Sequence, residues 1–110
     1  MDEISKRDTI IRTKILSEIK DIEEFLCDMT EDDFNNDSKT QKAVVMSLIN
    51  IGELSKAFTD SFIGSNKKIP WKKIQAMRNV AAHKYEIIDM DVVWDTVKVS
   101  VAELKSELSE

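Results

Sequence analysis

The sequence predicts an all-α protein, and three observations support this prediction. The 110 residues include only two glycines and one proline, which leaves little material for the repeated turns of a β-sandwich or barrel. Apolar residues recur three or four positions apart over long stretches, as they do on one face of a helix. The length suits one domain with one modest core. We therefore expect a single domain over residues 1–110, built as an up-and-down bundle of four to five helices.

The first helix is expected from about Ile4 to Met29. Polar residues separate apolar side chains that recur at helical spacing, at Ile11, Ile15, Ile19, Ile22 and Leu26. The Asp and Asn residues at 30–37 favour turns and should end this helix. Cys27, near its end, is expected to be a small buried side chain rather than a reactive thiol, because its neighbours are acidic.

The second helix is expected to begin at Ser38, which has the spacing of a capping box with Gln41, and to run to about Phe62. Gly52 lies within its apolar face at a cost of ~1 kcal/mol relative to alanine, so another helix or a ligand should approach closely there. Glu53 has two interpretations. It is either an exposed polar residue on the far face of the helix or part of the same cleft as the candidate site described below.

Two further helices complete the predicted bundle. Pro70 suits the first position of a third helix that runs to about Tyr85, because its missing N–H would be unpaired there anyway. Asp89 can cap a fourth helix that continues to the C-terminus. The β-branched residues of this last segment would also suit a strand, but its 3.6-residue period favours a helix. The apolar positions that define this period are Val93, Val97, Val101, Leu104 and Leu108.

Positive charge is concentrated in one part of an otherwise acidic chain. The formal net charge is −5, yet the segment from Ser61 to Tyr85 contains no Asp or Glu. A solvated lysine-rich helix start would account for the lysines alone, but an arginine and a histidine in the same window favour an anion-binding function. The basic residues of this segment are Lys67, Lys68, Lys72, Lys73, Arg78 and Lys84.

The cellular location is predicted from what the sequence lacks. A single cysteine cannot form an intrachain disulfide, and the N-terminus does not resemble a signal peptide. No run approaches the ~18 consecutive apolar residues that suggest a membrane span. We expect a cytoplasmic protein with no membrane partner.

The candidate functional site is the stretch from Arg78 to Tyr85, which holds the only histidine and the only tyrosine. His83 is the one side chain whose ordinary pKa lies near neutrality. At ~100° per residue, Arg78, Asn79 and His83 share a broad polar face, but Arg78 and His83 are ~140° apart. A straight helix does not point both side chains at one atom. Bending of the helix, a ligand that bridges them, or a second copy of the chain would complete the site.

At this point the residues match a family pattern. The Arg78-x4-His83-x-Tyr85 motif resembles that of the HepT-like toxins of the HEPN superfamily. Three outlying pieces resemble the same family in order and spacing, which makes the match more specific than the Arg/His pair alone. These pieces are Ile51-Gly52-Glu53, Ile69-Pro70-Trp71 and Val92-Val93-Trp94.

The resemblance implies a HEPN-like homodimer that acts as a metal-independent ribonuclease, with active sites at the dimer interface and no cofactor. It also implies a partner, a minimal nucleotidyltransferase antitoxin. By this resemblance Arg78 and His83 form the catalytic pair and Asn79 supports the site. Tyr85 is then the residue that the antitoxin can modify with AMP.

Attack by the RNA's own 2′-hydroxyl is a mechanism that suits these side chains. His83 would act as general base or acid, and Arg78 would stabilise charge on the phosphate. Residues at metal-ligand spacing are absent from the sequence, which agrees with a metal-free reaction. The lysines that we expect to position RNA phosphates are Lys67, Lys68, Lys72 and Lys73.

Two other functions fit the same sequence. The chain could be a non-catalytic helical module that docks on a nucleotidyltransferase and is modified by it at Tyr85. It could also be a helical interaction domain without a site.

Overall fold

The computed structural model describes residues 4–84 and 87–109, and for residues 80–84 it describes the helical backbone alone. The described residues form helices and turns, with no strand among them. The all-α prediction is confirmed. The helices are α1 (Lys6–Phe25), α2 (Glu31–Asn35), α3 (Ser38–Ser55), α4 (Asp60–Ser65), α5 (Trp71–Lys84), α6 (Met90–Asp95), the π-helical segment η2 (Thr96–Val101) and α7 (Ala102–Leu108).

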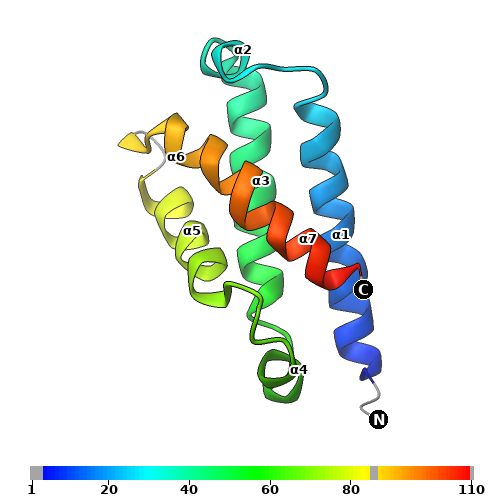
Figure 1. Ribbon diagram of the computed structural model, residues 1–110. Helices are drawn as coiled ribbons and strands as arrows, with labels where there is room; N and C mark the ends of the chain where they lie inside the picture. Colours follow the sequence, from blue (N-terminus) through cyan, green and yellow to red (C-terminus); the bar gives the residue numbers. More distant parts are fainter. Residues whose placement is uncertain (1–3, 85–86, 110) are drawn as a thin grey trace.

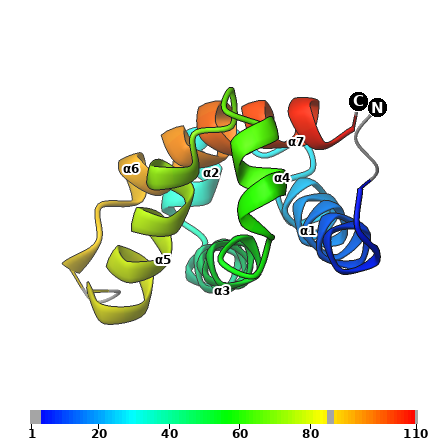
Figure 2. The same cartoon turned by 90° about the horizontal axis from the view of Figure 1, so that it is seen from below.

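Helix α3 lies at the centre of the bundle. Figure 1 shows α1 and α5 on either side of it, while the continuous segment α6–η2–α7 crosses in front. Seen from below in Figure 2, this C-terminal segment covers one side of the α1–α3–α5 layer, and the opposite side of α3 stays uncovered. The bundle therefore has a closed face, where the core lies, and an open face.

The core is formed by the positions that the apolar periodicity predicted. From α1 the buried residues include Ile15, Ile19 and Ile22, each at most 2% exposed. Phe34 of α2 is fully buried, and its ring centroid lies 5.5 Å from that of Trp94. Burial of one such side chain stabilises the fold by about 1.5–3 kcal/mol. Other buried residues at helical spacing include Ile11, Leu26, Val44, Leu48, Ile51, Phe58, Val93, Val101, Leu104 and Leu108.

The prediction of one helix from Ser38 to Phe62 is wrong, because α3 ends at Ser55 and the chain turns before α4. Thr59 caps α4 by accepting a hydrogen bond from the Phe62 amide at 3.1 Å. Asp8 of α1 fixes this turn by accepting from Thr59 N at 2.9 Å and Thr59 Oγ1 at 2.6 Å. Phe58 and Phe62 stack with ring centroids 4.2 Å apart. Their four-residue spacing therefore arises from a contact between the turn and α4, and not from one continuous helix.

Replacing Asp8 with asparagine is expected to lower the free energy of unfolding by about 1–3 kcal/mol at pH 7, because the half-buried Thr59 donors lose their charged acceptor. Burial raises the pKa of Asp8, but the hydrogen bonds from Thr59 and Ser5 and the charge of Arg7 outweigh it, so the pKa lies below its ordinary value. A carboxylate with a lowered pKa stabilises the fold above its unfolded pKa of ~3.9. The difference between wild type and variant should therefore shrink as the pH falls through the folded pKa of Asp8.

Urea unfolding at pH 7 and near pH 3 measures this difference. Asp21→Asn, a change of the same kind at a less buried position of α1, serves as the control and should behave like wild type at both pH values. An Asp8→Asn variant as stable as wild type at pH 7 would contradict the proposed role of the turn.

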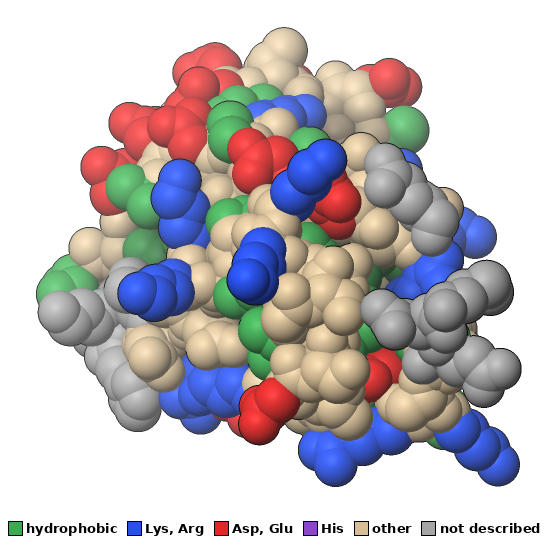
Figure 3. Space-filling view, turned by 60° about the horizontal axis from the view of Figure 1, so that its bottom comes forward, with side chains coloured by type: hydrophobic (Ala, Val, Ile, Leu, Met, Phe, Trp, Pro, Cys, Tyr) green, Lys and Arg blue, Asp and Glu red, His purple; other side chains and the backbone are tan. Residues whose placement is uncertain are grey.

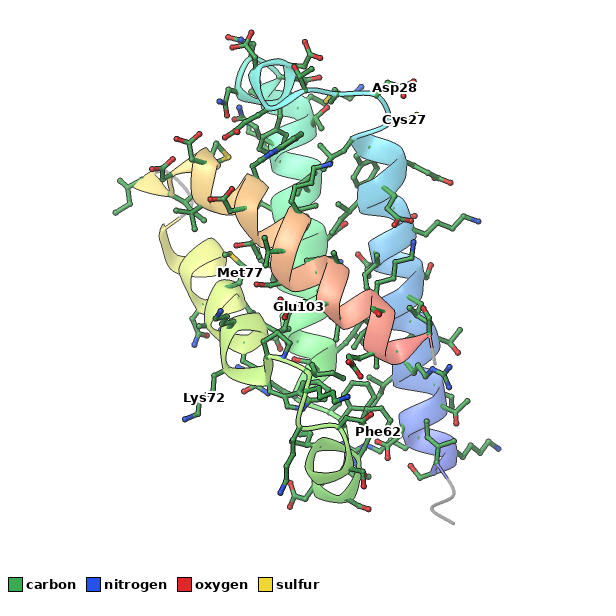
Figure 4. All side chains as sticks on the ribbon, viewed as in Figure 1. Cys27, Asp28, Phe62, Lys72, Met77 and Glu103 are labelled. Carbon is green, nitrogen blue, oxygen red and sulfur yellow. The ribbon has the colours of Figure 1, made fainter. Side chains whose placement is uncertain are left out.

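The end of α1 also differs from the prediction. The helix stops at Phe25, and Asp28 adopts a left-handed conformation with φ of 59°, which aspartate tolerates better than most residues. Cys27 is consequently exposed on the turn, at the upper end of α1 in Figure 4, so the prediction of a buried cysteine is wrong. The acidic segment that follows breaks the helix as predicted, but it forms the short helix α2.

The predicted capping box of the second helix is not formed. Asp37, one residue earlier, caps α3 by accepting from the Thr40 amide at 3.0 Å. Gln41 donates instead to the carbonyl oxygen of Phe34 at 2.9 Å, which ties α3 to the end of α2. The predicted cap of the last helix is confirmed, since Asp89 accepts from the Asp91 amide at 2.8 Å.

Candidate active site

The candidate site begins where α5 packs against α3 at Gly52. A Cβ atom placed on Gly52 would overlap Arg78 Cβ, and it would lie 3.1 Å from Arg78 Cγ and 3.3 Å from the carbonyl oxygen of Ile74. The glycine predicted to mark a close approach therefore marks the approach of another helix, and the aliphatic part of Arg78 lies directly on it. The missing side chain of α3 is what makes room for the arginine of α5.

The guanidinium of Arg78 is held by Glu53, the residue that follows Gly52 in α3. Its Nε forms an ion pair with Glu53 Oε1, and its Nη1 donates to Asn79 Oδ1 at 3.1 Å. The side chains of Arg78 and Glu53 are 27% and 50% exposed, so this pair stabilises the fold by less than about 1 kcal/mol. Glu53 is exposed, as the first interpretation expects, and its carboxylate contacts the predicted catalytic arginine, while its place in a shared cleft stays a prediction.

The polar face predicted for the third helix is partly described. Asn79 is exposed and contacts Arg78, as a supporting residue would. His83 lies in the last turn of α5, but its side chain is outside the described residues, as is Tyr85. A hydrogen bond between Asn79 and His83, which their i, i+4 spacing would allow, is therefore outside the described part of the chain as well.

The backbone of α5 bears on how Arg78 and His83 could act together. Its α-helix is continuous from Trp71 through Ala81 and Ala82 to Lys84, with no break between the two candidate residues. On such a helix they stay ~140° apart around the axis and about 7.5 Å apart along it. Of the three ways to complete the site, bending has no support in the described backbone, which leaves a bridging ligand or a second chain.

A shallow groove of about 390 Å³ lies between α1 and α3 and includes Glu53 in its lining. Asn50 of α3 lines it and donates to Glu18 Oε1 at 3.3 Å. The contribution of α1 to this region was not predicted, because Lys14 and Glu18 look like ordinary solvent-facing residues of an amphipathic helix. The groove is lined by Lys14, Ser17, Glu18, Asn50, Glu53 and Leu54.

The predicted RNA-binding lysines lie at one end of the molecule. Lys67 and Lys68 are exposed between α4 and α5, and Lys72 and Lys73 are exposed in the first turn of α5. Lys72 points away from the bundle in Figure 4. In Figure 3, separate basic side chains spread over the middle of the surface, whereas acidic side chains gather at its upper left.

The opposite end of the molecule is acidic. Exposed or half-exposed carboxylates of α2 and α6 meet there, and a hydrogen bond between the Glu31 and Asp91 side chains raises the pKa of Glu31. The nearby charges of Asp91, Asp95 and Asp89 raise it further. Phosphate groups should therefore be repelled from this end and drawn to the lysines at the other.

The described residues contain neither a metal-binding cluster nor a helix that could span a membrane. No group of three or more His, Cys, Asp and Glu side chains in the described part of the chain could hold a metal ion. Within residues 4–84 and 87–109, none of the helices combines the length and the apolar character needed to cross a bilayer.

The structure is an all-helical bundle in which Arg78 of α5 packs against α3. The single histidine follows in the same helix. These features can be compared with known protein families. The family described as Ribonuclease HepT-like matches residues 15–110. The chain belongs to this family.

Curated relatives agree with this assignment. A protein of Methanocaldococcus jannaschii named "Putative RNase" is 41% identical over 96 residues, which cover 87% of this chain and 79% of the relative. "Probable ribonuclease HepT" of Thermococcus cleftensis is 38% identical over 96 residues, 87% of each chain. A second "Putative RNase" of M. jannaschii is 34% identical over 106 residues, 96% of this chain and 97% of the relative. No solved structure matches the chain.

Proposed function

We propose that this protein is a metal-independent endoribonuclease that uses Arg78 and His83, at a cleft shared by two copies of the chain, and that it serves as the toxin of a toxin–antitoxin system. The observation that carries the proposal is the arrangement of Arg78, fixed on α3 by Gly52 and Glu53, in the helix that also carries His83. Membership of the Ribonuclease HepT-like family supports the reaction class.

The reaction needs no group beyond RNA and these side chains. His83 takes the proton of a ribose 2′-hydroxyl, and the 2′-oxygen attacks the adjacent phosphorus while the bond to the 5′-oxygen breaks. The products are a 2′,3′-cyclic phosphate and a 5′-hydroxyl, whose oxygen receives a proton from the imidazolium. Arg78 stabilises the extra negative charge on the phosphate oxygens as they pass through the transition state.

Two features of the surface support a site completed by a second copy. The continuous α5 keeps Arg78 and His83 on different sides of the helix, so one chain alone does not aim both at one phosphate. Met46 lies on the same stripe of α3 as Asn50 and Glu53 and is 57% exposed, which a self-associating surface would explain. A twofold pairing of these faces would bring two Arg/His sets together.

The lysines at the α4–α5 end are proposed to hold RNA phosphates without reading sequence. The double variant Lys72→Ala/Lys73→Ala should bind single-stranded RNA more weakly, and the dependence of log K on log salt should fall by about 0.7 for each lost contact. The control Lys39→Ala/Lys42→Ala removes the same charge from exposed positions near the other end of α3. Equal losses of affinity in both variants, measured by fluorescence anisotropy, would show that only net charge matters.

Regulation is proposed to act at Tyr85. A nucleotidyltransferase antitoxin would join AMP to the Tyr85 hydroxyl, which attacks the α-phosphorus of ATP, releases pyrophosphate and loses its proton. The added nucleotide would bring negative charge next to the site and oppose RNA binding. Mass spectrometry after incubation with ATP and such a partner tests this step, because Tyr85→Phe must then stay unmodified. A chain that gains AMP but never cleaves RNA would instead be the non-catalytic module.

A further inference from the structure

We infer that Glu53 is a positioning residue, which holds the Arg78 guanidinium so that its outer N–H groups face the RNA phosphate. The inference rests on the proposed function, because it assigns a role within the same site. It concerns how the arginine is oriented rather than which residue reacts.

The first support is the atom to which the carboxylate is paired. Arg78 Nε is buried and forms an ion pair with the Glu53 carboxylate, but it donates no hydrogen bond within the described part of the chain. A guanidinium binds a phosphate bidentately, either side-on through Nε and one Nη or end-on through both Nη groups. Glu53 pairs with Nε and so leaves the end-on mode through the two Nη groups.

The second support is that neighbouring residues fix the rest of the side chain. Gly52 lies beneath Arg78 Cβ and Cγ, so the aliphatic part has little freedom to move toward α3. Asn79 Oδ1 accepts from Nη1 and sets the plane of the guanidinium. An arginine has five N–H groups. One of them donates to Asn79, and the Nε–H lies against Glu53 in the ion pair. The three remaining N–H groups, all on the Nη atoms, have no partner in the described part of the chain, which is enough to bind a phosphate through two of them.

The third support is electrostatic, and it gives the proposal a distinctive signature. A carboxylate beside a phosphate-binding arginine repels RNA, so its removal should not weaken RNA binding. Loss of a fixed orientation should instead slow the chemical step, because small misplacements of a reacting group cost rate steeply. Loss of the Glu53 carboxylate should therefore lower kcat without raising KM, a combination that a residue that merely stabilised the fold would not produce.

Kinetics of Glu53→Gln test this signature on the full-length protein. We expect kcat to fall about 10- to 100-fold while KM for RNA stays the same or decreases. Glu53→Asp, which keeps the charge on a shorter side chain, should recover part of the loss. Glu23→Gln removes the carboxylate of the other ion pair, with Lys105, and should behave like wild type. An unchanged or higher kcat in Glu53→Gln would overturn the proposal.

Coupling between the two residues provides a second test. If Glu53 acts through Arg78, then Glu53→Gln in an Arg78→Ala background should cause no further loss of kcat. A full additional 10- to 100-fold loss in that background would show that Glu53 acts independently of the arginine, and the assignment would fail.

A measurement without RNA separates this inference from the proposed function. The chain has only three arginines, so protein labelled with ¹⁵N-arginine gives three Nε–H signals, and Arg78→Lys identifies the one from Arg78. Glu53→Gln should shift that signal and speed its exchange with water, whereas Glu23→Gln should leave it in place. An unaffected signal overturns the positioning role. If the signal shifts but the protein never cleaves RNA, the proposed function is rejected, while the contact by which Glu53 positions Arg78 is supported.

Discussion

Alanine in place of His83 is expected to reduce the rate of RNA cleavage by about 10²- to 10⁴-fold, the usual contribution of a general acid or base. No other histidine is present in the 110 residues to replace it. The rate is measured on a short single-stranded RNA in the presence of a chelator. The same RNA with a 2′-deoxyribose at the cleaved position should resist the wild-type enzyme, because the nucleophile is missing.

Arg78→Ala should reduce the same rate by about 10²- to 10³-fold, the typical cost of removing one group that stabilises the developing charge. Arg7→Ala is the matched control, since Arg7 also belongs to a helix and donates through Nε, to the carbonyl oxygen of Ala57. Circular dichroism and native mass spectrometry should show unchanged helicity and assembly for the Arg78 and His83 variants. Cleavage at the wild-type rate by either folded variant would rule out the proposed catalytic pair.

Gly52→Ala is the structural change with the largest expected effect. The new methyl group would overlap Arg78 Cβ, which lies near the backbone and cannot rotate away, so α3 and α5 must separate or Arg78 must move. Overpacking of this kind costs about 1–3 kcal/mol, partly offset by up to ~1 kcal/mol from the better helix propensity of alanine. We expect a lower free energy of unfolding together with a strong loss of cleavage.

Gly64→Ala is the control for this substitution, because Gly64 also lies in a helix and a Cβ there has no atom within 4 Å among its described neighbours. It should leave cleavage unchanged and stabilise the protein by about 0.5–1 kcal/mol in urea unfolding. If Gly52→Ala is as stable and active as wild type, the close packing of α5 on α3 is not what positions Arg78.

The fold was predictable where the relevant interactions are local. The apolar residues of α1 and α3 recur at helical spacing and are buried, and Asp89 caps the last helix as its sequence context predicts. The errors arise from contacts between distant residues. The chain turns after Ser55 because Asp8, 51 positions away from Thr59, accepts hydrogen bonds at that turn. No local pattern around Phe58 and Phe62 could reveal this.

The candidate site shows the same limit. The stretch from Arg78 to His83 stood out because its residue types are rare in this chain, and Gly52 stood out because glycine is costly inside a helix. That Arg78 and Gly52 touch, and that Glu53 engages Nε, depends on how α3 and α5 are paired in three dimensions. The spacing of Arg78 and His83 within one helix could indicate that another group is needed to complete the site, but it could not identify that group.

Mixing the two inactive variants tests the claim that the working site belongs to a pair of chains. If Arg78 of one chain acts with His83 of the other, a dimer of Arg78→Ala with His83→Ala contains one intact site. Random exchange makes half of the dimers mixed, each with one of two sites intact, so activity should recover to about a quarter of wild type. If native mass spectrometry shows mixed dimers and the mixture stays as inactive as either variant alone, the shared site is contradicted.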